Sequence, residues 1–222
     1  INAGIGAVFL VAAGVFLLVK QDMLSQIAGI TIGGVSLKKE MNSVYLAALC
    51  FLGVLSYISA PSISLEGKSL WILKSCPVTS RQILAGKLLF HLAVCIPPLL
   101  FAQGAVFWVQ RPAPAMAAVM TALPVLMVIL CGQMGLMWNL LFPRLDFLSE
   151  TQVVKNSLSS TLTLLLSMLF SILPILLRLG TGLGLGIVQE AYFAFWTAAA
   201  AAGCVGLQIW LNGRGARRFE EL

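Results

Sequence analysis

Residues 62–90 read SISLEGKSLWILKSCPVTSRQILAGKLLF, and this stretch decides where the chain enters the membrane. Pro77 divides it, because proline lacks the amide proton that a helix interior needs. Beyond the proline, Thr79 and Gln82 have the spacing of a capping box, in which each side chain bonds the amide of the other residue. We therefore predict a helix that begins directly after this cap and becomes largely apolar only beyond Lys87.

The half of this stretch that precedes the proline predicts a second, shorter helix over residues 66–75. Its residues 70–73, LWIL, are consecutive and therefore point to all sides of a helix, so more than one side must be covered. One side can rest on the ends of membrane helices, with Trp71 at the level of the lipid headgroups. The other side needs a partner. A helix that merely anchors the loop among the headgroups is an equally good interpretation.

The composition is that of a membrane protein. Of the 222 residues, 59% are hydrophobic and 10% are charged, and the mean hydropathy is +0.98, whereas soluble domains carry about 25% charged residues. Apolar runs recur along the chain, which leaves no room for a soluble catalytic domain. The net charge of +6 is spread over short loops. We therefore expect the lipid bilayer, and no nucleic acid, as a partner.

The apolar runs predict an all-α, polytopic fold with a single transmembrane domain over residues 1–222. Each run has about the length that a bilayer requires. The link over residues 20–42 is either a re-entrant or an interfacial segment, and the sequence does not distinguish the two. Because the first span begins at once, we expect the chain to be a piece of a longer protein. The six predicted spans are 2–19, 43–64, 85–109, 115–141, 157–178 and 190–211, and a cytoplasmic elbow occupies 65–84.

The basic residues predict the orientation. Of the 14 lysines and arginines, nine fall on one side of the six-span arrangement and five on the other. The richer side is expected to be the cytoplasm, which places both termini there and the chain in the cytoplasmic membrane. The nine are Lys68, Lys74, Arg81, Lys87, Arg144, Lys155, Arg214, Arg217 and Arg218, and the five are Lys20, Lys38, Lys39, Arg111 and Arg178.

Prolines lie inside three of the predicted spans. Pro97 and Pro98 are in the third, Pro124 in the fourth and Pro174 in the fifth. Each removes a helix donor and favours a kink, which membrane helices tolerate when their neighbours satisfy the freed carbonyl. We take Pro97 and Pro98 as a possible hinge, although such kinks equally suit helices shaped for packing.

Sites for chemistry within the membrane are not predicted. No acidic or basic residue falls in the middle of a span, whereas ion-coupled carriers usually keep one there. The single histidine, His91, is expected at the membrane interface, and Arg178 is expected to reach the surface from the end of the fifth span. The five cysteines form no C-x-x-C pair. We therefore predict no catalytic residue, no metal site and no cofactor.

The segment SISLEGKS, residues 62–69, is one residue away from a phosphate-binding loop. The pattern G-x-x-x-x-G-K-[ST] needs a glycine where this chain has Ser62. Such a loop also follows a strand and opens a helix, whereas here a membrane span precedes it, and Glu66 would oppose the phosphates. We therefore expect no nucleotide at this segment.

The elbow resembles the cytoplasmic loop of type 2 ATP-binding cassette (ABC) transporter permeases, and in its longer form a bacterial branch of ABC exporters. A second stretch is similar to the next cytoplasmic loop of that branch. The first resemblance is carried by Glu66-Gly67, Leu73, Pro77-Val78-Thr79, Ile83-Leu84 and Gly86-Lys87-Leu88-Leu89. The second is carried by Phe142-Pro143-Arg144-Leu145-Asp146-Phe147, Glu150 and Val153-Val154-Lys155.

The resemblance implies a permease subunit that pairs with a second permease subunit or half. Residues 66–76 would be a coupling helix that docks onto a separate ATPase subunit, which binds the ATP. Two positions depart from the pattern, Lys68 in place of a frequent threonine and Cys76 in place of an aliphatic residue. The implied contact residues are Glu66, Gly67, Leu70, Trp71, Leu73, Lys74 and Pro77.

Two other classes of function remain as alternatives. A membrane-embedded enzyme or assembly factor would need a cluster of polar residues at one depth, and a secondary carrier would need an ionisable residue inside the bundle. The candidates for the first are Glu66, His91, Arg144, Asp146 and Glu150.

Overall fold

The secondary structure is predominantly helical in the computed structural model, which describes residues 4–20, 31–32, 35–145, 157–180 and 186–222. One short antiparallel pair of strands joins Thr31 to Ser36 and Ile32 to Val35. The elements in chain order are α1 (Ile5–Val19), β1 (Thr31–Ile32), β2 (Val35–Ser36), α3 (Leu37–Val54), η2 (Ser64–Ser69), α4 (Leu70–Ser75), α5 (Ser80–Gln110), α6 (Pro114–Leu141), α8 (Leu158–Ile175), η3 (Leu176–Gly180), α9 (Gln189–Trp210), η4 (Leu211–Gly215) and α10 (Ala216–Glu221).

In the described part of the chain, four helices are long and apolar enough to cross a membrane, which makes the chain a multi-pass membrane protein. They coincide with the last four predicted spans, although the final helix continues beyond residue 211 through η4 into α10. Proline is tolerated inside three of them, as predicted. The four are Ser80–Gln110, Pro114–Leu141, Leu158–Leu179 and Gln189–Glu221.

The first two predicted spans correspond to shorter helices. α1 has 15 residues, and α3 ends at Val54, so the prediction that the second span continues to residue 64 is wrong. The segment beyond Val54 is rich in serines, whose hydroxyls bond the backbone and so compete with a helix. Ser56 Oγ, for example, accepts the amide of Ala7 at 3.0 Å. Pro61 adds a residue that cannot donate a helix hydrogen bond.

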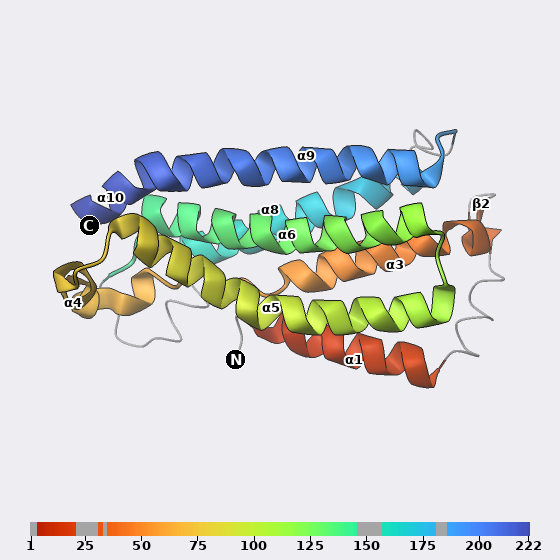
Figure 1. The fold of residues 1–222 in the computed structure, drawn as a ribbon, viewed down its shortest axis with the longest axis horizontal. Helices are drawn as coiled ribbons and strands as arrows, with labels where there is room; N and C mark the ends of the chain where they lie inside the picture. Colours follow the sequence, from red (N-terminus) through yellow and green to blue (C-terminus); the bar gives the residue numbers. More distant parts are fainter. Residues whose placement is uncertain (1–3, 21–30, 33–34, 146–156, 181–185) are drawn as a thin grey trace.

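α6 is the central helix of the bundle. It packs against α3, α5, α8 and α9, while α1 packs against α5 and α3. Figure 1 shows α5, α6, α8 and α9 running in alternating directions, with α5 bent part-way along its length. Pro97 and Pro98 lie in the interior of α5 and remove its helix donors there. Figure 1 also shows η2, α4 and α10 at one end of the bundle, which we call the elbow end.

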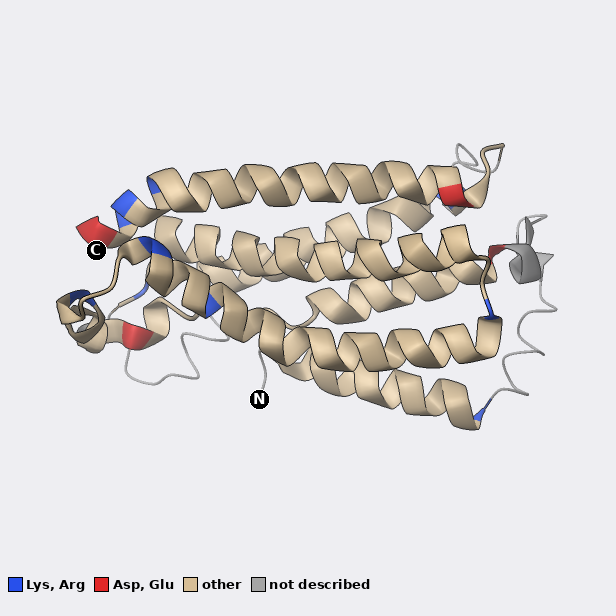
Figure 2. Cartoon of the chain, in the orientation of Figure 1, with Lys and Arg blue, Asp and Glu red and all other residues tan. Residues whose placement is uncertain are grey.

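The charged residues lie at the two ends of the bundle. Figure 2 shows the acidic and basic residues at the elbow end and at the opposite end, with the long middle of the described helices free of them. This separation is the one expected for a bundle whose middle lies in hydrocarbon, because a charge there costs about 3 kcal/mol or more. The basic residues of the elbow end include Lys74, Arg81, Lys87, Arg144, Arg214, Arg217 and Arg218.

His91 is buried between α5 and α6, so its predicted position at the membrane interface is wrong. The side chain is fully buried, and its Nε2 lies 3.2 Å from the carbonyl oxygen of Val128. Gly132 makes room for the ring, since a Cβ at that position would lie 2.8 Å from His91 Cδ2. A hydrogen bond of this kind allows a polar ring to be buried in an apolar bundle.

Arg178 is buried as well, and the prediction that it reaches the surface is wrong. Its Nε and Nη2 donate to the two carboxylate oxygens of Glu40 at 2.8 and 3.0 Å. Its guanidinium carbon lies 5.3 Å from the centre of the Tyr192 ring. Gln189 also donates to Glu40. The pair therefore joins the beginnings of α3 and α9 to the end of α8, opposite the elbow.

Replacing Glu40 with glutamine is expected to lower the free energy of unfolding by about 3–5 kcal/mol, because the buried guanidinium then lacks its counter-charge. The measurement is unfolding of the purified protein in detergent micelles, followed by temperature or denaturant. The matched control is Glu190→Gln in the first turn of α9, which is partly exposed and is not in the pair. Equal stability of the two variants would contradict this role of the pair.

Candidate functional site

The elbow contains two consecutive short helical segments, and the helical backbone is broken inside the first of them. η2 is a 3₁₀ helix and α4 is an α-helix, so the short helix predicted before Pro77 is present, but in two parts. Gly67 lies inside η2 and interrupts its helical backbone with φ 50° and ψ −126°. A residue with a Cβ adopts this conformation only under strain, whereas glycine adopts it readily.

A buried asparagine fixes the beginning of the elbow to the bundle. Asn139 of α6 accepts from the amide of Ser64 at 2.9 Å and from its hydroxyl at 3.1 Å. The Asn139 Nδ2 donates to the hydroxyl of Ser159 in α8 at 3.4 Å. Ser64 Oγ in turn accepts the amide of Arg144 at 2.9 Å. The elbow, α6 and α8 therefore meet at one side chain.

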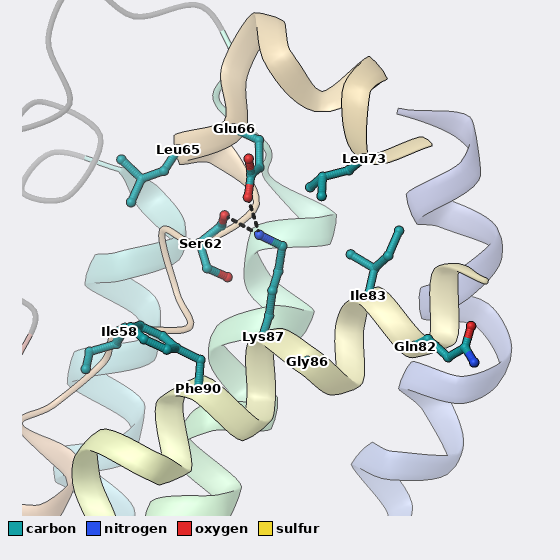
Figure 3. A pocket seen from close by; sticks show the side chains of 10 residues that line it. All are labelled: Ile58, Ser62, Leu65, Glu66, Leu73, Gln82, Ile83, Gly86, Lys87 and Phe90. Carbon is teal, nitrogen blue, oxygen red and sulfur yellow. Dashed lines mark hydrogen bonds and ion pairs between the residues drawn. The ribbon is translucent and has the colours of Figure 1, made fainter. Parts of the chain in front are cut away.

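An ion pair fixes the elbow to α5. Lys87 Nζ lies 2.7 Å from Glu66 Oε1 and 2.9 Å from the carbonyl oxygen of Ser62. Figure 3 shows the Lys87 side chain reaching from α5 into the space beneath η2. The Glu66 carboxylate is therefore held against the protein, with about a third of its side-chain surface exposed.

A hollow of about 480 Å³ surrounds this ion pair. Its walls are mainly apolar, and Leu73 and Ile83 face each other across it in Figure 3. Apart from the ion pair, the polar residues of the lining are Ser62 and Gln82. A phosphate-binding loop directly follows a strand. Among the described residues, turns and not a strand connect α3 to η2, so η2 lacks that context.

α4 has one buried and one exposed side. Leu70 is 5% exposed and packs in a cluster with Ile63, Leu84, Leu136, Leu140, Leu211 and Phe219. Trp71 and Ile72 are 68% and 50% exposed. Two large apolar side chains thus point away from the bundle, beside each other, on a helix that is only six residues long.

The predicted helix cap is present at the start of α5. The Thr79 amide donates to Gln82 Oε1 at 2.9 Å, and the Gln82 amide donates to Thr79 Oγ1 at 3.4 Å. These bonds satisfy amides that would otherwise be unpaired at a helix start. The direction of α5 is therefore set where it leaves the elbow.

The carboxyl-terminal helix α10 also contacts the elbow, which the sequence did not predict. Lys74 Nζ donates to the carbonyl oxygen of Glu220 at 3.0 Å, and Ser80 Oγ donates to the Glu220 carboxylate at 2.9 Å. Arg218 Nε donates to the carbonyl oxygen of Leu140 in α6 at 3.0 Å.

The seven contact residues implied by the resemblance have different environments. Glu66 is paired with Lys87, Gly67 and Leu70 are buried, and Leu73 lines the hollow. Trp71, Lys74 and Pro77 are exposed, as is Ile72, which the resemblance did not include. Most of the second resembling stretch, residues 146–155, lies outside the described residues.

The described residues contain no group of three or more histidine, cysteine, aspartate or glutamate side chains that could hold a metal ion. The candidate hinge residues, Pro97 and Pro98, line a groove between α5 and α1. The site that stands out is therefore the elbow, with its exposed apolar pair and its anchors in three other helices.

Comparisons with protein-family models, with curated proteins and with solved structures returned no match for this chain. The comparisons therefore assign no family to this chain.

Replacing Gly67 with alanine is expected to lower the free energy of unfolding by about 1–3 kcal/mol, because alanine is strained at this backbone conformation. The measurement is again unfolding in detergent micelles. The matched control is Gly86→Ala in α5, where a Cβ meets nothing within 4 Å. Helical alanine there should be neutral or stabilising by up to about 1 kcal/mol. A Gly67 variant as stable as the Gly86 variant would contradict the assigned strain.

Proposed function

We propose that this chain is the transmembrane permease subunit of an ABC transporter, of the type 2 exporter class. It moves substrate across the bacterial cytoplasmic membrane, and a separate ATPase subunit supplies the energy. The observation that carries the proposal is the exposed pair Trp71 and Ile72 on a helix whose other side is buried. Such an apolar pair at the end of a bundle suits a contact with another protein.

The charge at the elbow end supports the orientation that this proposal needs. Figure 2 shows basic residues gathered at the elbow end, and among the residues described there and at the opposite end, those of the elbow end are the more numerous. Excess lysine and arginine marks the cytoplasmic side of short-loop membrane proteins. On this proposal the elbow faces the cytoplasm, where the ATPase and its ATP are found, and the chain itself holds no ATP.

The anchors of the elbow suggest how a push on α4 would reach the membrane. Asn139 connects the elbow to α6 and α8, Lys87 connects it to α5, and Lys74 connects it to α10. Closure of two ATPase subunits would displace α4, and these contacts would pass the displacement to several spans together. The prolines of α5 give one of these spans a place to bend.

The other two classes receive no support of their own. The buried pair of Glu40 and Arg178 is the kind of group that a secondary carrier uses, but it lies at the end of the bundle opposite the elbow, where α3 begins. His91 bonds a backbone carbonyl, and no acidic residue among those that the structure describes joins it in the polar cluster that an embedded enzyme needs.

Replacing both Trp71 and Ile72 with serine is expected to abolish most of the effect of the permease on the rate of ATP hydrolysis by the ATPase subunit. The fold of the permease should not change. The measurement is the ATPase rate of the proposed ATPase subunit, purified and reconstituted with the permease in vesicles. Truncation of a central apolar contact costs about 2 kcal/mol or more. The affinity of the ATPase subunit for the double variant should therefore fall by about thirtyfold or more.

Two controls separate a lost contact from a lost fold. Ile187→Ser removes an exposed apolar side chain at the opposite end and should leave ATPase binding unchanged. The melting temperature of the double variant should equal that of the unmodified protein, since both side chains are largely exposed. Unchanged binding and unchanged ATPase rate in the double variant would overturn the proposal.

A further inference from the structure

An apolar hollow of about 440 Å³ lies between α6, α8 and α9. On α9 it is lined by small residues, because the chain reads AAAAAG over residues 198–203 and Ala199, Ala200 and Gly203 form part of the wall. Met134 and Trp138 face it from α6. Its volume is in the range of ligand sites. Since all three helices are long and apolar enough to cross a membrane, we expect the hollow to border hydrocarbon.

A second hollow, of about 390 Å³, follows at the elbow end and has a different character. Its lining includes three arginines, Arg214, Arg217 and Arg218, and a single acidic residue, Glu221. Arg218 is held by the carbonyl oxygen of Leu140. Arg214 and Arg217 are exposed. This hollow therefore offers a positive surface at the level where the apolar part of the bundle ends.

The two hollows lie along the same seam between α6 and α9. On α6, Trp138 lines the first hollow and Leu141, three residues further on, lines the second. On α9, Leu207 lines the first and Trp210, again three residues further on, lines the second. Residues three apart on a helix lie on one face, about one turn from each other. The seam thus changes from apolar to basic within about one helical turn.

Two tryptophans of the first hollow have unused hydrogen-bond donors. The Nε1 atoms of Trp138 and Trp196 are buried and have no partner among the described residues. Because neither nitrogen has accessible surface, these two tryptophans contribute apolar ring surface to the wall of the hollow rather than a hydrogen bond. Trp138 is the one closer to the basic hollow, three residues before the end of α6.

We propose that this seam binds one anionic phospholipid from the leaflet on the elbow side. Its phosphate lies against Arg214 and Arg217, and one acyl chain lies in the apolar hollow, where it packs against the side chain of Trp138. Basic pockets at helix ends bind anionic lipid headgroups, and alkyl chains fill apolar space beside membrane helices. Lipid is favoured over a soluble phosphate because the basic hollow continues into an apolar one. This inference does not depend on the ATPase partner.

The test is a titration of the full chain, in a neutral maltoside detergent, with dioleoylphosphatidylglycerol, read as bound lipid by native mass spectrometry. The same measurement uses dioleoylphosphatidylcholine, which has no net charge, and glycerol 3-phosphate, which has no chain. We expect phosphatidylglycerol to bind most tightly. The double variant Arg214→Gln with Arg217→Gln should bind phosphatidylglycerol with an affinity lower by about fivefold for each arginine removed.

Two further variants separate the headgroup from the chain. Ala199→Trp fills the apolar hollow from an exposed position and leaves both arginines in place. It should also lower the affinity for phosphatidylglycerol by about tenfold. Arg111→Gln removes an exposed arginine at the opposite end and should change nothing. Melting temperatures establish that each variant is folded.

Three results would overturn the proposal. The first is equal binding of phosphatidylglycerol by the double arginine variant and the unmodified chain. The second is equal binding of glycerol 3-phosphate and phosphatidylglycerol, which would leave a phosphate site without a lipid. The third is an Ala199→Trp variant that binds as tightly as the unmodified chain.

Discussion

The buried side chain of Asn139 holds the elbow end of the bundle together. It is fully buried, and its two polar atoms bond Ser64 of the elbow and Ser159 of α8. A buried amide that loses its partners costs about 1–3 kcal/mol, and the hydrogen bonds of such a network strengthen one another in a medium of low dielectric constant. The position of η2 is therefore fixed by α6, and the positions of Gly67 and α4 follow from it.

The contacts that hold the elbow to α6, α5 and α10 differ in strength. A displacement of the elbow should therefore move these three helices to different extents. The bonds to Asn139 are buried, the ion pair to Lys87 is partly exposed, and the contacts of Lys74 and Ser80 with Glu220 are exposed. Exposed ion pairs and hydrogen bonds contribute little because water competes for them. α6 should therefore receive more of a push than α5, although α5 follows the elbow directly in the chain. Because α6 packs against four other helices, it can pass a displacement across the bundle.

The sequence predicts the local features of this chain and misses the distant ones. The cap at Thr79 depends on a residue three positions away, and the last four spans depend on average hydropathy, so both are correct. The partner of His91 is 37 residues away and that of Arg178 is 138 residues away. Without these partners, a polar residue near the end of a span is naturally assigned to the surface. The end of the second span was missed because its serines are only weakly polar and the run around them is apolar.

The residues that carry the resemblance to ABC permeases also have structural roles, which affects the weight of that resemblance. Glu66 pairs with Lys87, and Gly67 adopts a backbone conformation that suits glycine. An acidic residue followed by glycine is therefore explained by the geometry of the loop, whether or not another protein binds there. Trp71 and Ile72 are different, because their side chains are exposed. No packing against the described residues explains why two large apolar residues stand there. The case for a docked partner thus depends on these two residues more than on the motif that first suggested it.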